Sequence, residues 1–190
     1  MGDISEMSEL YLALGGDDPT FEAEASYAIA WAPEGSTIGL DLGCGWRKVS
    51  PWLKGVDHHS GEWIEEGDKP HIATPDIVAD VRELPFGDCS QDLVVTLHTL
   101  EHFADSEPLL KEWFRVLRVG GRLVVVVPDW RYTFSCKDEN QIASSEGHKV
   151  DFTLDALIRT VAKALPEAEI LDSRVVNYHW SVGIALEKVA

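Results

Sequence analysis

The segment Leu40-Asp41-Leu42-Gly43-Cys44-Gly45 constrains the fold of this chain more than any other part of the sequence. It is an apolar run that leads directly into two glycines one residue apart. Glycine allows the main chain to adopt a positive φ and allows a ligand to approach the backbone closely. Asp41 comes just before the glycines, and a second carboxylate, Asp57, follows sixteen residues after Asp41. This pattern is typical of the first strand and ligand-binding turn of an α/β fold that binds a nucleotide-like molecule.

The apolar periodicity of the rest of the chain predicts alternating strands and helices. We expect helices over residues 20–31, 106–117 and 154–165, with Gly120-Gly121 as the stop of the second and Thr153 as the N-cap of the third. The expected strands cover residues 37–42, 56–57, 76–80, 92–97, 123–127, 169–176 and 181–189. The short connection between the last two strands favours antiparallel pairing. The predicted fold class is therefore α/β, with a doubly wound, mostly parallel, Rossmann-like sheet.

The net charge of −17 weighs against a nucleic-acid partner, because such binders need basic surface to displace counterions from phosphate. The first forty residues hold eight acidic residues and no Lys or Arg. This acidity either keeps the protein soluble or indicates a cationic or neutral small-molecule substrate. We expect a single domain over residues 1–190, with an acidic cap segment over 1–36 and a catalytic core over 37–190.

The three cysteines, Cys44, Cys89 and Cys136, are odd in number and widely spaced, which argues against a disulfide framework and for a reducing compartment. No apolar run approaches the ~20 residues of a membrane span, and no basic region followed by an apolar one marks a secretory signal. We therefore expect a cytoplasmic protein without a membrane partner. The sequence does not indicate an oligomeric state.

Several segments resemble, in order, the motifs of class I S-adenosylmethionine-dependent methyltransferases, and in particular a type 11-like methyltransferase domain. They are the turn at 40–45, Gly55-Val56-Asp57, and the segments 79–86, 90–95, 100–102 and 117–123. The resemblance implies a sheet of seven strands in the order 3-2-1-4-5-7-6, with strand 7 antiparallel. It also implies S-adenosyl-L-methionine as the cofactor and methyl transfer as the activity.

The resemblance further implies which residues contact the cofactor. Asp41 would accept a hydrogen bond from the ammonium group, Asp57 from both ribose hydroxyls, and Asp80 from the adenine amine. All these cofactor groups are donors, which suits carboxylate acceptors. The full set of implied contacts is Asp41, Gly43, Cys44, Gly45, Asp57, His58, Asp80, Val81 and His98.

Two other readings of the glycine turn remain open. A nicotinamide-dependent enzyme would need glycine at the sixth position of the motif, where this chain has Lys48. A non-catalytic module that binds S-adenosylmethionine without turnover would keep the same residues. The chain also departs from the family pattern at Arg47, which replaces the usual third glycine, and in the short segment from Gly45 to Asp57, which leaves room for about one helical turn.

His102 and His148 are the candidate catalytic bases, with core packing or a backbone hydrogen bond as the alternative role for each. His98, Glu101 and His102 could in principle hold a metal ion, but we expect none, because such histidines more often line a pocket. The segment 129–134 resembles loops of methyltransferases from sugar and glycan pathways. We therefore expect a small-molecule acceptor, such as a sugar or another hydroxylated metabolite.

Overall fold

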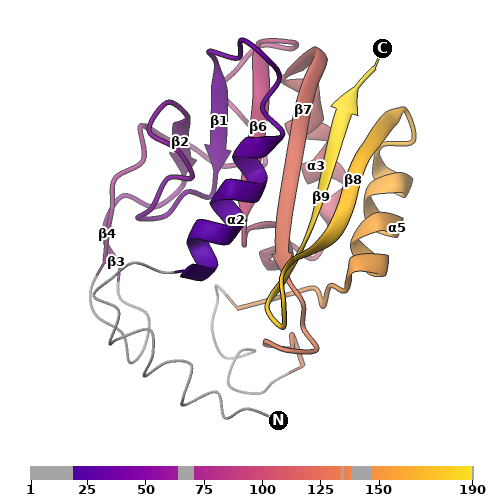
Figure 1. Cartoon of the computed structure of the whole chain (residues 1–190). Helices are drawn as coiled ribbons and strands as arrows, with labels where there is room; N and C mark the ends of the chain where they lie inside the picture. The colour runs from indigo at the N-terminus through magenta and orange to yellow at the C-terminus, as the bar shows by residue number, and fades with distance from the viewer. Residues whose placement is uncertain (1–18, 64–70, 134, 138–146, 190) are drawn as a thin grey trace.

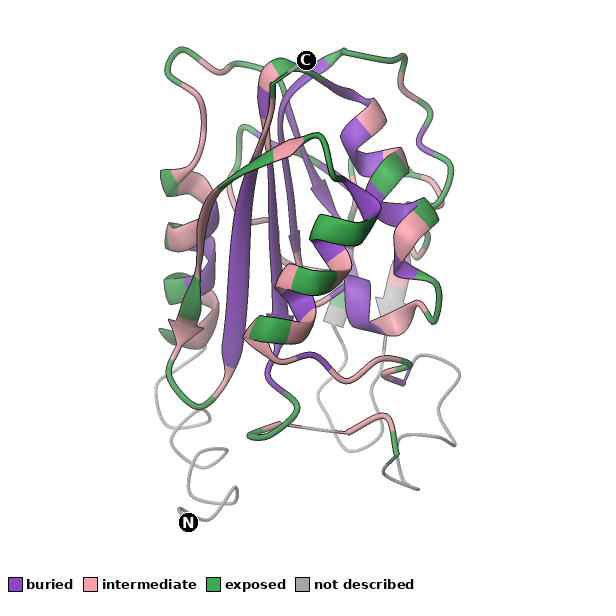
Figure 2. Cartoon of the chain, turned by 90° about the vertical axis from the view of Figure 1, so that its right-hand side faces the viewer, coloured by how far each residue is buried: buried purple, intermediate pink, exposed green. Residues whose placement is uncertain are grey.

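The computed structural model describes residues 19–63, 71–133, 135–137 and 147–189. A seven-stranded sheet lies between α2 on one face and α3 and α5 on the other (Figures 1 and 2). The elements are α2 (Pro19–Ala30), β1 (Gly39–Leu42), β2 (Lys54–Asp57), β3 (Gly61–Trp63), β4 (His71–Ala73), β5 (Ile77–Val78), β6 (Gln91–Leu97), the 3₁₀ helix η1 (Leu100–His102), α3 (Ser106–Arg115), β7 (Leu117–Pro128), α5 (Leu154–Ala164), β8 (Ala168–Asn177) and β9 (Ser181–Lys188).

The strand order of the sheet is β5-β2-β1-β6-β7-β9-β8. The neighbours from β5 to β7 pair in parallel, whereas β9 runs antiparallel to both β7 and β8. In Figure 1 the arrows of β1 and β9 accordingly point in opposite directions. This order confirms the predicted arrangement 3-2-1-4-5-7-6 with strand 7 antiparallel.

The central strands are buried on both faces, as parallel strands between two helical layers must be. On β6, Val94 belongs to the larger apolar cluster, which includes residues of α3 and α5. Its neighbours Leu93 and Val95 belong to a smaller cluster with Ala28 of α2. The alternation follows from the period of two residues along a strand. It explains why β6 is a nearly continuous apolar run in the sequence.

The helix boundaries confirm one capping prediction and correct another. Thr153 is the N-cap of α5, and its Oγ1 accepts a hydrogen bond of 3.2 Å from the backbone N–H of Ala156. The prediction that Gly120-Gly121 ends the preceding helix is wrong, because α3 ends at Arg115 and both glycines lie inside β7. Gly120 has a φ of +77° there, where the pairing of β6 with β7 shifts register. The glycines therefore serve a bulge in the strand.

Two connections lie on the β1 side of the sheet. Residues 43–53 cross from β1 to β2 through turns without a helix, a further reduction of the single helical turn expected there. The antiparallel pair β3–β4 was not predicted.

Within the described part of the chain, no helix combines the length and apolar character needed to cross a bilayer. Residues 1–18 of the expected acidic cap lie outside the described residues.

Candidate functional site

The carboxyl ends of β1, β2 and β6 meet at one edge of the sheet. Leu42, the last residue of β1, pairs with Val56 on one side and Thr96 on the other. The segments that follow these strands are therefore neighbours in space. Ligands of open α/β sheets bind at this edge.

The turn after β1 requires glycine at position 43. Gly43 and Gly45 have φ values of +70° and +51°. A Cβ atom on Gly43 would lie 2.2 Å from Oγ1 of Thr99, which itself donates to the carbonyl of Leu42. Cys44 between the glycines is buried, and its burial raises the pKa of its thiol to about 12. The turn thus presents backbone, and no reactive thiolate, to the edge.

Asp57 ends β2 directly beside this turn. Its Oδ2 accepts a hydrogen bond of 2.9 Å from the Gly45 N–H, and its Oδ1 accepts one of 2.9 Å from the His59 N–H. A carboxylate oxygen can accept a second bond, so each oxygen of Asp57 retains capacity for a ligand donor. The exposed ring of His58 lies with Nδ1 3.3 Å from Oδ1. Asp57 therefore stabilises the turn and offers an acceptor at the sheet edge.

Asp80 follows β5, the strand next to β2. The Ala79 N–H donates to the carbonyl of Asp57 over 2.9 Å, which fixes the two strand ends against each other. The Arg82 guanidinium binds both oxygens of Asp80 and lowers the pKa of this carboxyl. Val81 is buried, and its carbonyl accepts a 2.9 Å bond from the Trp113 indole.

Asp41 lies inside β1 and is 2% exposed. Its Oδ2 accepts a 2.6 Å hydrogen bond from the Val49 N–H, so it holds the segment after the glycine turn. Burial raises the pKa of Asp41 to about 7. Next to this segment, the Arg47 guanidinium lies over the rings of Phe21 and Trp46, and Lys48 pairs with Asp76 at 2.8 Å.

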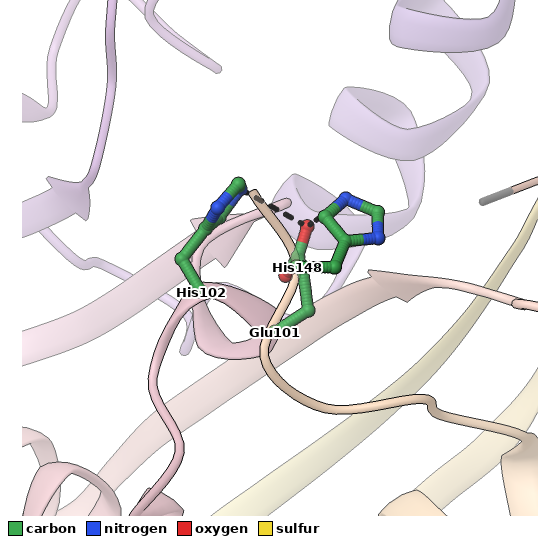
Figure 3. Close-up of side chains that lie close together, drawn as sticks. All are labelled: Glu101, His102 and His148. Carbon is green, nitrogen blue, oxygen red and sulfur yellow. Dashed lines mark ion pairs between the residues drawn. The ribbon is translucent and has the colours of Figure 1, made fainter. Parts of the chain in front are cut away.

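A second group of titratable residues follows β6. His98 has a φ of +52°, and its Nε2 lies 3.0 Å from both carboxylate oxygens of the buried Glu24 of α2. Its Nδ1 lies 3.8 Å from Oε1 of Glu101 in η1. The same oxygen lies 3.7 Å from Nε2 of His102 and 3.9 Å from Nε2 of His148 (Figure 3).

Backbone contacts hold the His148 segment over η1. The N–H groups of Lys149 and Val150 donate to the carbonyl of Glu101 over 2.7 Å and 3.1 Å. His148 is far from His102 in the chain. The structure nevertheless brings the two imidazole rings to a centroid distance of 5.2 Å. The two predicted catalytic histidines therefore share one site.

Glu101 is the centre of this group. It is 1% exposed, and burial raises its pKa to about 7. Neither of its carboxylate oxygens accepts a hydrogen bond from any described residue. Sequence reasoning gave Glu101 no catalytic role and missed Glu24 altogether, because neither belongs to a motif that reveals its burial.

The loop after β7 is held by bonds within the loop and by backbone bonds from Asp129 and Trp130 to the carbonyls of Trp180 and Phe152. The buried Asp129 pairs with Arg131 at 2.5 Å, while Trp130 and Tyr132 are exposed. Residue 134 of this predicted acceptor loop lies outside the described residues.

A mostly parallel sheet with a glycine turn after β1 and carboxylates at neighbouring strand ends is typical of α/β proteins that bind a nucleoside-type cofactor. Residues 40–125 match the family model described as a methyltransferase domain. Over these residues the chain is similar to methyltransferase domains, and its fold is that of the S-adenosylmethionine-dependent methyltransferase structures that it matches.

Relatives of known sequence and structure agree with this assignment. The chain is 31% identical over 126 residues to a demethylmenaquinone methyltransferase from Lactococcus lactis, with 66% of this chain and 44% of that protein aligned. A methyltransferase structure from Thermotoga maritima matches with a TM-score of 0.63 at 20% identity, covering 97% of this chain and 96% of that one. Geranyl diphosphate C-methyltransferase from Streptomyces coelicolor matches with a TM-score of 0.62 at 14% identity, covering 88% and 79%. The chain spans about half, or less, of the length of the curated relatives it matches.

The matched structures include methyltransferases that use S-adenosyl-L-methionine, and the residues at the sheet edge of this chain fit the chemistry of that cofactor. Its ammonium, ribose hydroxyls and adenine amine are hydrogen-bond donors, and the acidic side chains Asp57 and Asp80 stand at adjacent strand ends. At Gly43 the missing side chain leaves room for Thr99, and the positive φ of Gly43 and Gly45 lets the backbone turn at this edge.

Proposed function

We propose that this protein transfers a methyl group from S-adenosyl-L-methionine to a small-molecule acceptor, a sugar or another hydroxylated metabolite. The observation that carries the proposal is the position of Asp57, which is buried at the end of β2 and bonded to the glycine turn. Asp57 would bind the ribose hydroxyls and Asp80 the adenine amine. Gly43, Cys44 and Gly45 would pass the methionine end along their backbone, with Asp41, His58, Val81 and His98 as the remaining contacts.

When bound, the cofactor supplies a methyl group that its sulfonium charge already activates. The contribution of the chain is to align the acceptor, exclude water and remove a proton. A hydroxyl acceptor must lose its proton as the new oxygen–carbon bond forms, and that proton would pass to an imidazole nitrogen of His102 or His148. Their common neighbour Glu101 would stabilise the positive charge that results.

The acceptor class is the second part of the proposal. Two relatives carry names that point to other acceptors, demethylmenaquinone and geranyl diphosphate. The polar set of histidines and carboxylates after β6 favours an acceptor with hydroxyl groups. A panel of sugars, phenols and prenyl diphosphates, assayed for S-adenosylhomocysteine release, distinguishes these classes.

Titration of the protein with S-adenosylhomocysteine tests the cofactor site directly. We expect affinity in the micromolar range for the unmodified chain and a loss of at least about tenfold for Asp57→Asn, because charge-assisted hydrogen bonds are about twice as strong as neutral ones. Asp88→Asn is the matched control, since Asp88 is exposed and pairs with Arg115 in the turn before β6. Equal affinity of Asp57→Asn and Asp88→Asn would reject the role of Asp57. Binding without methyl transfer to any acceptor would favour the non-catalytic alternative.

A further inference from the structure

Glu101 has an unusual environment for a carboxylate. The side chain is 1% exposed, and neither oxygen accepts a hydrogen bond within the described part of the chain. Burying a carboxylate without donors is unfavourable, so nearly all buried polar groups have a partner in a protein, a water molecule or an ion. Glu101 therefore calls for a positively charged or donating partner at its carboxylate.

The residues around Glu101 are arranged around one oxygen. Nε2 of His102 and Nε2 of His148 lie 3.7 Å and 3.9 Å from Oε1. One ligand atom from each of Glu101, His102 and His148 lies within 4.8 Å of the other two. Figure 3 shows the carboxylate between the two rings. These distances exceed hydrogen-bond length, and they are about half an ångström longer than the roughly 3.3 Å between ligands of a tetrahedral zinc ion.

His98 is a third histidine near Oε1 of Glu101. Its Nε2 is committed to Glu24 at 3.0 Å, and its Nδ1 faces Oε1 of Glu101 at 3.8 Å. At 3.8 Å this contact is longer than a hydrogen bond, so His98 adds a further nitrogen near the carboxylate but does not fix its orientation.

We propose that Glu101, His102 and His148 form a binding site for one divalent transition-metal ion, with Zn²⁺ as the representative ion. Two imidazoles and one carboxylate are the protein ligands of known catalytic zinc sites, which keep a fourth position for water or substrate. Imidazole ligands also favour such ions over Mg²⁺ and Ca²⁺. The sequence predicts no metal ion at His98, Glu101 and His102, since such histidines more often line a pocket, and it does not show that His148 reaches Glu101.

The proposed ligands adjoin the cofactor turn. Thr99, directly before η1, donates to the carbonyl of Leu42, and a Cβ atom on Gly43 would meet its Oγ1. Glu101 and His102 therefore belong to the segment that directly follows this contact with the turn. If the proposed function holds, the ion would bind the acceptor hydroxyl, lower its pKa and release its proton to water. His102 and His148 would then act as metal ligands rather than as bases.

Zinc binding to the full chain tests the proposal without cofactor or acceptor. After chelator treatment and dialysis, titration with Zn²⁺ at about pH 7.5 is expected to show one tight site, because imidazole must be neutral to bind a metal. The Cys89→Ser background removes the exposed thiol, a competing zinc ligand. We expect Glu101→Gln and His148→Ala each to weaken Zn²⁺ binding at least about tenfold. Substitution with Co²⁺ should give visible absorption that both variants lose.

His179→Ala is the matched control, since His179 is an exposed histidine that packs against Tyr132 and Tyr178 away from Glu101. It should bind Zn²⁺ as tightly as the parent. Circular dichroism establishes whether each variant is folded. If His148→Ala does not fold, the nearly isosteric Glu101→Gln still tests the metal site. Failure to take up one equivalent of Zn²⁺, or equal affinity in all variants, would overturn the metal site. If Zn²⁺ does not bind but S-adenosylhomocysteine does, the metal site is rejected and the proposed function stands. If Zn²⁺ binds but S-adenosylhomocysteine does not, the proposed function is rejected and the metal site stands.

Discussion

At the scale of single residues, burial sets the chemistry of this edge of the sheet. Asp41 and Glu101 are both almost fully buried, and burial raises the pKa of each to about 7. Asp80, in contrast, is partly exposed and bonded to Arg82, which lowers its pKa. Carboxyl groups of the same kind, a few strands apart, therefore differ in protonation near neutral pH because of their surroundings.

Asp41 makes stability depend on pH in a way that can be measured. Its pKa is about 7 in the folded chain against an ordinary value of 3.8, so the folded chain holds a proton that the unfolded chain loses between these values. The free energy of unfolding should therefore fall as pH rises from about 4 to about 7 and then level off. Asp41→Asn removes this contribution while keeping an acceptor for the Val49 N–H.

Urea unfolding of the unmodified chain and Asp41→Asn at about pH 5 and about pH 8 tests this. The variant should gain about 2 to 3 kcal/mol relative to the unmodified chain at the higher pH, since one pKa unit corresponds to about 1.4 kcal/mol. A difference that stays constant between the two pH values would contradict the raised pKa.

At the scale of elements, the sequence predicts those whose apolar period is clear. The residues of α5, β6 and β7 that face the core follow the expected spacing, and Thr153 caps α5 as its side chain suggested. The predicted helix end at Gly120-Gly121 was wrong, because a glycine pair occurs in a strand bulge as readily as at a helix end. The pair β3–β4 was missed because each strand has only three residues.

The junction of β1 with η1 gives a prediction about packing between elements. Gly43→Ala places a methyl group 2.2 Å from Oγ1 of Thr99, in addition to the strain of a φ of +70°. Gly35→Ala is the matched control, because Gly35 has a φ of +75° and nothing within 4 Å of its Cβ position. We expect Gly35→Ala to cost about 1 to 2 kcal/mol, the usual penalty of that conformation, and Gly43→Ala at least about 1 kcal/mol more.

Thermal unfolding of both glycine variants measures the difference. Thr99→Ala combined with Gly43→Ala should cost less than the sum of the two single changes, because the added methyl group gains room. Equal destabilisation of Gly35→Ala and Gly43→Ala would show that the Thr99 contact does not restrict the turn.

At the scale of the whole molecule, topology decides what the sequence could not. The meeting of the glycine turn with Asp57 and Asp80 at one edge of the sheet was predictable, because these residues lie at the ends of neighbouring strands. The group around Glu101 was not, because it joins Glu24 of α2, His98 after β6 and His148 before α5. Glu24 and His148 are far in the sequence from His98 and Glu101. The contact of α2 with β6 brings Glu24 to His98, and the backbone bonds of Lys149 and Val150 to Glu101 bring His148 to η1.

The net charge of −17 is a second property of the whole molecule, and it predicts a response to salt. Self-repulsion among like charges destabilises the compact state, and salt screens it over a Debye length that falls from about 30 Å at 0.01 M to about 10 Å at 0.1 M. The melting temperature at about pH 8 should therefore rise by several degrees when NaCl is raised from about 0.01 M to about 0.5 M. Near the isoelectric point of about 4.6 the net charge vanishes, so the rise should shrink as pH approaches about 5.

Exposed pairs such as Arg174 with Asp172 oppose the effect, because salt weakens them, but such pairs contribute little. A melting temperature that falls with salt at about pH 8 would mean that local attraction outweighs repulsion across the surface.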